Sequence, residues 1–551
     1  MRVSLWWLIG LCLFTFVVGL GGPAISESDE AYYAEAGREM VESGDWITPR
    51  FNYANRFEKP ILFYWMVSAS YLLGGVSETA ARAGSALSAL GLVLLTAWFA
   101  RRWHDDTTAL IAGAIVATSF GCVALARTAR PEMLLAFSVT AAIACGLVAL
   151  DDTRSRSTRW WVLASAAAAL AFLTKGPVGV AVPAVVLLPV MATGRRWRRL
   201  RLRPLALAAL VFLVIAVPWY ALMAREHGIA YLRGFFVGDN LERFATARYN
   251  DPRSPFYYLP IAFGGMLPWS PFFLAALPSA WGLLRRRVRL SARDAQLIAW
   301  VAMPLLLMTA SVGKQAHYAL PVLPPLSLLL ARVIRDRLDP DLLPGRDLRR
   351  RLFRAAGVLA GLVLAVIGPA IVRASPLLLH GNPGTITLAA GVVVAAGLAV
   401  AALSLSSRWT WAPAALAAAT AATIVSLQLA VVDPPGPDAV EQLAREIAIQ
   451  RGAGEQVGTY RIFGRSLVFY THVQQVGIYD DAGLQAFLSS PERVLCVLPE
   501  ADLVRLKQVR PPGLRRLATI RYFDPATAKP RTLLWPDATR DVQTAVLVSN
   551  R

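Results

Sequence analysis

The chain has 551 residues, a formal net charge of +20 and 56% hydrophobic residues, with a mean hydropathy of +0.48. Long apolar runs recur along most of it, which excludes an ordinary soluble protein. The positive charge does not indicate a nucleic-acid partner. Its arginines gather in loops that follow every second apolar run, the distribution that the positive-inside rule describes for membrane proteins.

We expect about thirteen membrane-spanning helices, because a span needs roughly 20 apolar residues. The run 60–75 is shorter and rich in Tyr and Trp, so we predict that it lies at the membrane interface. The first run is predicted to be a retained anchor rather than a cleaved signal peptide, since many apolar runs follow it. In chain order the predicted spans are 5–22, 83–100, 107–125, 133–150, 159–174, 177–194, 204–223, 257–283, 296–312, 316–331, 353–372, 386–405 and 410–431.

The arginine-rich loops, such as 195–203 and 285–293, are predicted to be cytoplasmic. This orientation puts the N-terminus in the cytoplasm and the first loop, 23–82, outside the membrane. An odd number of spans then carries the C-terminal tail to the outside as well.

Residues 433–551 differ in composition from the membrane domain, 1–432, and predict an α/β domain outside the membrane. After a turn-rich linker, 438–450 has the spacing of an amphipathic helix, and a second helix is expected at 501–507. Short runs with alternating apolar residues predict strands at 457–462, 466–472, 474–480, 493–499, 518–523 and 544–550.

Unusual polar side chains gather at the predicted outer ends of the helices. Ionisable groups near membrane depth are costly and usually functional, so their convergence on one side predicts a site there. The candidates, in chain order, are Asp29, Glu30, Glu58 and Lys59 in the first outer loop, Arg127, Arg130 and Glu132 in the second, Lys175 in the third, Arg243 and Asp251 in the fourth, and Lys314, His317 and Tyr318 in the fifth.

Each candidate also has a purely structural interpretation. Asp29 could cap the helix that follows it, and Lys175 could extend its ammonium group to the interface. Arg127 and Glu132 could form an ion pair, and Tyr318 could be an ordinary aromatic residue of the membrane interface. Only the clustering of these residues on one side favours the functional interpretation.

The combination of cations and carboxylates indicates a particular chemistry. Several Lys and Arg residues at one membrane face suit an anionic headgroup, above all a phosphate. Acidic residues beside them suit a general base together with a metal or an orienting acid. The sequence therefore predicts group transfer from a lipid phosphate, with cations stabilising the leaving phosphate.

The run DEAYYAEAGREMVESGDWITPRFN, followed by FEKPILFYW, resembles the first periplasmic loop of the protein mannosyltransferase and aminoarabinose (lipid A) transferase superfamily. The resemblance continues with FLTKGPVGVAVP, VPWY, PFYYLP and K-x-x-x-Y-x-L-P-x-x-P, so it covers the whole membrane part and, by layout, the tail. It implies a GT-C fold glycosyltransferase of the bacterial inner membrane, with about thirteen transmembrane helices and an extracytoplasmic α/β domain.

The resemblance also implies roles for the candidates. The donor would be a polyprenyl-phosphate-linked sugar, and the acceptor lipid A, another glycolipid or a protein. By this comparison the catalytic acid is Asp29, with Glu30 beside it, and Glu58 stands where the family acid has been linked to a metal. The predicted donor-binding residues are Lys59, Lys175, Arg243, Lys314 and Tyr318, and the further site candidates are Tyr32, Tyr33, Arg127 and Glu132.

The chain departs from the family pattern at three places. Tyr32 stands where the family often has Arg, and Glu132 stands where it usually has Asp. The fourth loop, RYNDPRSPF, lacks the His that often precedes its Pro-Phe pair. The sequence therefore predicts no firm cofactor, leaves a divalent metal open, and does not fix the sugar.

The alternative from another class is a transporter or flippase of lipid-linked sugars. A transporter needs polar groups near the middle of several spans, and the predicted spans carry almost none there. A non-catalytic membrane scaffold would not require Asp29, Glu58, Lys59 and Lys175 together. The sequence thus favours the glycosyltransferase.

Overall fold

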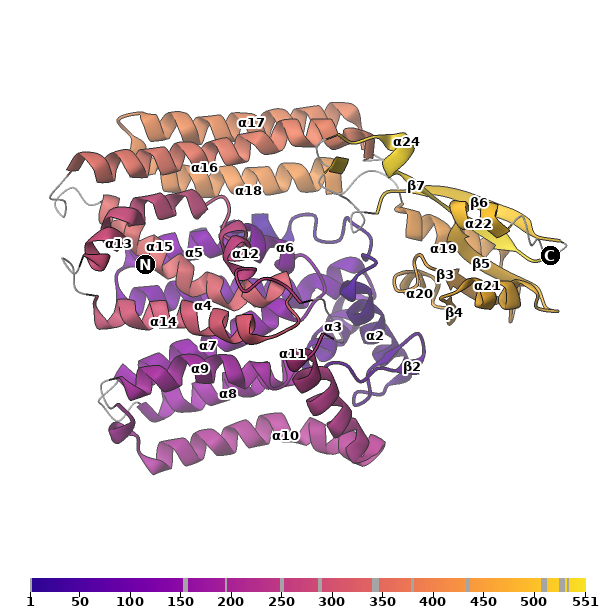
Figure 1. The fold of residues 1–551 in the computed structure, drawn as a ribbon, viewed down its shortest axis with the longest axis horizontal. Helices are drawn as coiled ribbons and strands as arrows, with labels where there is room; N and C mark the ends of the chain where they lie inside the picture. Colours follow the sequence, from indigo (N-terminus) through magenta and orange to yellow (C-terminus); the bar gives the residue numbers. More distant parts are fainter. Residues whose placement is uncertain are drawn as a thin grey trace.

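The structure is a computed structural model that describes every residue except 1, 152–156, 194–195, 248–251, 286–289, 339–345, 378–380, 433–436, 507–512, 525–530 and 533–534. Its long helices run side by side (Figure 1). The first outer loop and the C-terminal sheet lie together at one end of these helices, so the elements that carry the predicted site are gathered there.

The helical part consists of α1 Arg2–Cys12, η1 Leu13–Val17, α2 Asp29–Ser43, α3 Leu62–Gly74, α4 Glu78–Trp103, α5 Asp106–Thr118, α6 Phe120–Ala126, α7 Glu132–Asp151, α8 Ser157–Lys175, α9 Val178–Ala192, η2 Arg196–Arg199, α10 Leu202–Arg233, η3 Gly234–Glu242, α11 Arg243–Ala245, α12 Tyr258–Gly265, η4 Ser270–Ala276, α13 Leu277–Leu284, α14 Ala292–Ala310, η5 Ala316–Val322, α15 Leu323–Leu338, α16 Arg346–Ala374, η7 Ser375–Leu377, α17 Pro383–Leu405, η8 Trp409–Trp411, α18 Ala412–Leu427 and η9 Gln428–Val432.

Each of the predicted spans coincides with one of these helices or with a consecutive set of them. Within the described residues, seven helices are long and apolar enough to cross a membrane, or up to nine if each bent pair counts as one span. The pair α5 and α6 bends by 58°. The multi-pass helical architecture is therefore confirmed, whereas the count of about thirteen crossings stays a prediction.

The first outer loop folds into a helix, a hairpin and a second helix. Ser28, rather than Asp29, caps α2, because its side chain accepts a hydrogen bond from the backbone N–H of Glu30. The helix ends at Gly44, which takes the left-handed conformation (φ 69°) that favours glycine. A short antiparallel pair follows, β1 Arg50–Phe51 and β2 Ala54–Asn55, and then the apolar α3, which is too short to span a membrane.

A buried ion pair fixes this loop to the membrane helices. The carboxylate of Glu30 lies 2.8 Å from Nε of Arg82 on α4, and both side chains are almost fully buried. Glu30 also accepts hydrogen bonds from the backbone N–H groups of Ser26 and Ala129. Burial tends to raise the pKa of Glu30, but Arg82 and these N–H groups outweigh it and lower the pKa below its ordinary value.

The C-terminal part forms a five-stranded sheet with strand order β4-β3-β5-β7-β6. Strands β4, β3 and β5 are parallel, and β7 runs antiparallel to both β5 and β6. The elements are α19 Ala439–Gln450, β3 Gln456–Tyr460, α20 Leu467–Thr471, β4 Gln475–Ile478, α21 Asp481–Leu488, β5 Val494–Pro499, α22 Glu500–Leu506, β6 Arg515–Tyr522, α24 Ala538–Asp541 and β7 Gln543–Ser549.

One predicted strand, 466–472, is instead the helix α20. Leu467, Val468 and Phe469 are all buried, whereas a surface strand would bury alternate residues. Leu467 packs in the core under the sheet, and Phe469 packs in the core of the first outer loop. These two sets of tertiary contacts outweigh the strand propensity of the segment.

The C-terminal sheet domain docks on the first outer loop through several hydrogen bonds. The side chain of Asn52 donates to the carbonyl of Gln475 and accepts from its N–H, both at 2.8 Å. The hydroxyl of Tyr470 on α20 accepts from the backbone N–H of Ile25 and donates to Glu78. The two parts are therefore joined next to α2, where the predicted site begins.

Candidate active site

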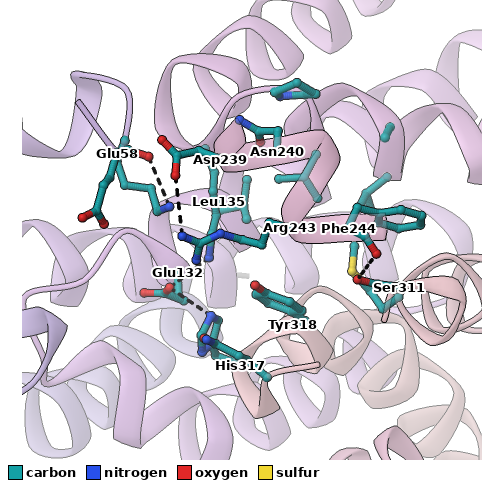
Figure 2. A pocket seen from close by; sticks show the side chains of 18 of the residues that line it. Glu58, Glu132, Leu135, Asp239, Asn240, Arg243, Phe244, Ser311, His317 and Tyr318 are labelled. Atoms are coloured by element: carbon teal, nitrogen blue, oxygen red, sulfur yellow. Dashed lines mark hydrogen bonds and ion pairs between the residues drawn. The ribbon is translucent and has the colours of Figure 1, made fainter. Parts of the chain in front are cut away.

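A cavity of about 530 Å³ opens among the outer ends of the helices. It is lined by α2, the loop between β2 and α3, the start of α7, the α8–α9 turn, η3 with α11, and η5. Figure 2 shows charged side chains from these separate elements pointing toward one another. The cavity therefore unites groups from all five outer loops that the sequence singled out.

Glu132, at the start of α7, is one of these charged side chains, and it is only 6% exposed. Its carboxylate is 3.0 Å from Nζ of Lys175, 3.4 Å from Nε of Arg130 and 3.4 Å from Nε2 of His317. The four side chains come from α7, the end of α8, the second outer loop and η5. Because a buried carboxylate is stable only when it is paired, Glu132 fixes the positions of these basic groups.

The turn between α8 and α9 sets the direction of Lys175. Gly176 has φ +71°, and a Cβ there would lie 2.7 Å from the ring of Phe235. A Cβ on Gly179 would lie 2.4 Å from the backbone of Ala171. Only glycine fits at either position, so the Lys-Gly-Pro turn is tight and brings Lys175 into the cavity. Its Nζ lies 5.3 Å from the centre of the Tyr318 ring.

Lys59, Asp239 and Arg243 also line the cavity, and Figure 2 shows Asp239 next to Arg243. The guanidinium of Arg243 lies 3.8 Å from the carboxylate of Asp239. Burial, together with the positive charges of Arg243 and Lys175, lowers the pKa of Lys59 from 10.5 to about 8. The cavity thus holds several cations close enough to repel one another, which is the arrangement that a bound anion would stabilise.

Asp29, the first residue of α2, lines the same cavity. Its side chain is 52% exposed, and Oδ2 accepts a hydrogen bond from Arg130 at 3.0 Å. Since Arg130 also faces Glu132, Asp29 is linked to the buried charge cluster while its other oxygen remains accessible. Tyr33, one turn of α2 further on, lines the wall beside it.

Other sequence candidates lie outside the cavity lining. Glu30 is paired with Arg82, as described above, and does not line the cavity. Asp251 lies outside the described residues. Arg127 donates to the carbonyls of Thr15 and Val18 at the end of η1. The buried ammonium of Lys314 donates to the carbonyl of Ser311. The ring of Tyr32 packs edge-on against Phe51.

Sequence reasoning missed Arg56 and Asp239, which both line the cavity. Arg56 stands just before the Glu58-Lys59 pair, and its guanidinium lies 2.9 Å from the Glu58 carboxylate. Asp239 lies in the polar segment GDNLER, in the fourth predicted outer loop. Its place in the same loop as Arg243, four residues before that arginine, was the signal that could have revealed it.

Comparison with known proteins identifies the family. Residues 12–227 match the dolichyl-phosphate-mannose-protein mannosyltransferase family. The chain is 31% identical over 456 residues to the undecaprenyl phosphate-alpha-4-amino-4-deoxy-L-arabinose arabinosyl transferase of Edwardsiella ictaluri, with 80% of each chain covered. It is 31% identical over 509 residues to the transferase of that name from Pseudomonas paraeruginosa, with 90% of this chain and 88% of the relative covered. The chain belongs to this arabinosyl transferase family.

The fold agrees with this assignment. The crystal structure of ArnT from Cupriavidus metallidurans bound to undecaprenyl phosphate matches with a TM-score of 0.74 at 23% identity, covering 99% of this chain and 97% of that chain. The expected GT-C fold, with its small C-terminal sheet domain, is therefore confirmed.

The metal that the family resemblance links to Glu58 does not fit the residues in this structure. The Glu58 carboxylate already faces the guanidinium of Arg56. Outside the undescribed segments, no group of three His, Cys, Asp or Glu side chains is placed to hold a metal ion. We therefore derive no step through a metal.

The pKa of Lys59 predicts how phosphate binding depends on pH. A phosphate monoester carries its second charge above a pKa of about 6, so Lys59 is the group that titrates above neutrality. The protonated ammonium binds the anion, so its contribution is complete well below pH 8 and is lost as the pH rises past the pKa of Lys59 in the free protein. We expect the affinity for the polyprenyl phosphate predicted from the sequence to fall between about pH 8 and 10.

The matched control is Lys59→Arg, because a guanidinium stays charged throughout this range. Calorimetric or fluorescence titrations between pH 7 and 10 should give a flatter profile for Lys59→Arg than for the wild type. Identical profiles for the two proteins would contradict the placement of Lys59 at the phosphate.

Proposed function

We propose that this protein transfers a sugar, with 4-amino-4-deoxy-L-arabinose as the first candidate, from undecaprenyl phosphate to lipid A or another acceptor at the outer face of the bacterial inner membrane. One observation carries the proposal: the accessible carboxylate of Asp29 and the cations Lys59, Lys175 and Arg243 line a single cavity. The relatives described above are named as transferases, which supports transfer over the transport alternative.

The residues suggest how the transfer proceeds. The carrier phosphate binds among the cations, which stabilise the charge that develops on it as the bond between the sugar C1 and the phosphate oxygen breaks. An acceptor hydroxyl forms the new bond to C1 and gives its proton to Asp29. The apolar lining from α7 and α9, including Leu135 and Val182, suits the hydrocarbon of the lipid.

Replacing Asp29 with Asn tests the role of the carboxylate. Loss of a general base typically lowers the rate by about 10²–10⁴-fold, so we expect that decrease in kcat, with little change in affinity for undecaprenyl phosphate. Transfer from the undecaprenyl-phosphate-linked sugar to lipid A would be measured with purified protein.

Glu42→Gln is the matched control, since Glu42 is also on α2 and is also 52% exposed, but it pairs with Arg38 away from the cavity. It should retain activity within about twofold, the size expected for a surface change. Near wild-type turnover by a folded Asp29→Asn protein would rule out the assignment.

We also propose that the C-terminal domain lies outside the cytoplasm. Its hydrogen bonds to the first outer loop support a location of the loop and the domain on the same side of the membrane. Such a location requires an even number of membrane crossings between the two. Twelve of the predicted spans lie in that interval. The arginine-rich segment 195–203 would be cytoplasmic by the positive-inside rule.

Reporter fusions test this orientation. A fusion after Arg199 should report the cytoplasm and a fusion at Arg551 the periplasm, because short basic loops resist translocation. If both fusions report the cytoplasm, the number of crossings is wrong and the cavity cannot lie at the outer face.

A further inference from the structure

The C-terminal domain contacts the first outer loop close to two residues that line the cavity. The backbone N–H groups of Arg465 and Ser466 donate to the two carboxylate oxygens of Glu27, each at 2.8 Å, and the Ser466 hydroxyl donates to the same carboxylate at 2.6 Å. Glu27 precedes the α2 cap, Ser28, and Asp29 follows that cap directly. These contacts therefore hold the chain at the point where it enters the cavity.

A second contact runs through an aromatic ring. The guanidinium carbon of Arg465 lies over the ring of Tyr32, 5.1 Å from its centre. The guanidinium carbon of Arg56 lies over the same ring at 3.7 Å. Arg465 belongs to the C-terminal domain, whereas Arg56 lines the cavity. Tyr32 thus connects a residue of the sheet domain with a residue of the candidate site.

The Tyr32 ring and the carboxylate of Glu58 both hold Arg56. Its side chain is 12% exposed, and its buried Nε has no hydrogen-bond partner among the described residues. A guanidinium stacked on an aromatic face is held by the π-electron charge without a directional hydrogen bond. Anything that reorients the Tyr32 ring would therefore move a cation in the cavity wall.

We propose that Arg465 and Ser466 are positioning residues for transfer: they hold Asp29 through Glu27 and Arg56 through Tyr32. This role rests on the proposed function. It makes the C-terminal domain part of the catalytic apparatus without placing any of its atoms in the cavity. It also assigns a function to Tyr32, the position at which the family often has Arg.

The guanidinium of Arg465 can be removed without undocking the domain. The backbone bonds of Arg465 and Ser466 to Glu27 do not need that side chain, and the contacts from Asn52 to Gln475 and from Tyr53 to His472 are elsewhere. Arg465 is exposed, so its replacement should leave the melting temperature unchanged.

The test compares Arg465→Gln with Arg461→Gln. Arg461 is also exposed and also lies over a tyrosine ring, at 4.7 Å, but that ring is Tyr460 within the C-terminal domain. With undecaprenyl-phosphate-linked sugar and lipid A as substrates, Arg465→Gln should lower kcat/KM for the donor about two- to fivefold, the effect of one cation–π contact. Arg461→Gln should match the wild type, and Arg465→Lys should restore most of the loss.

A double-mutant cycle tests whether Arg465 acts through Tyr32. Tyr32→Leu removes the ring, whereas Tyr32→Phe keeps it and should stay close to wild type. If the ring carries the effect, Arg465→Gln should cause no further loss in the Tyr32→Leu background. If the two substitutions instead act independently, so that the loss in the double variant is the product of the two single losses, the positioning role would be overturned.

Hydrogen–deuterium exchange provides a readout that needs no substrate. Exchange in peptides covering 50–60 should rise in Arg465→Gln and stay unchanged in Arg461→Gln. An inactive wild type would count against the proposed function alone, because the exchange comparison would still stand. An active wild type in which Arg465→Gln equals Arg461→Gln in both activity and exchange would overturn this inference alone.

Discussion

The site depends on one buried carboxylate, Glu132, and on the basic side chains that its charge requires. A carboxylate this deeply buried is strongly destabilising unless cations and hydrogen-bond donors surround it. Lys175, Arg130 and His317 meet that requirement from three different elements. Three segments that are distant in sequence, around residues 130–132, 175 and 317, are thereby fixed around one point, and the cavity lies beside them.

Two neighbouring acids at the start of α2 show how the fold separates structural from chemical roles. Successive residues on a helix point in directions about 100° apart, so Glu30 faces α4 and Arg82 while Asp29 faces the cavity. The first charge is buried and neutralised, and it anchors the loop. The second remains accessible and is linked to the cluster through Arg130.

Sequence reasoning predicted the helical architecture and the clustering of Asp29, Lys59, Lys175 and Tyr318, because apolar runs and groups of charges can be read locally. It could not separate Asp29 from Glu30, since the partner Arg82 is 52 residues away. It placed a strand at 466–472, where contacts with two different cores produce a helix. The docking of the C-terminal domain rests on backbone groups of Arg465, Ser466 and Gln475, which carry no sequence signature.

The most direct test of the central claim is to locate the carrier phosphate in a cryo-electron microscopy structure of the protein with undecaprenyl phosphate. We predict that the phosphate lies in the cavity, within hydrogen-bonding distance of Lys59, Lys175 or Arg243, and that Asp29 remains open to the acceptor side. A phosphate bound outside this cavity, in a complex competent for transfer, would contradict the account.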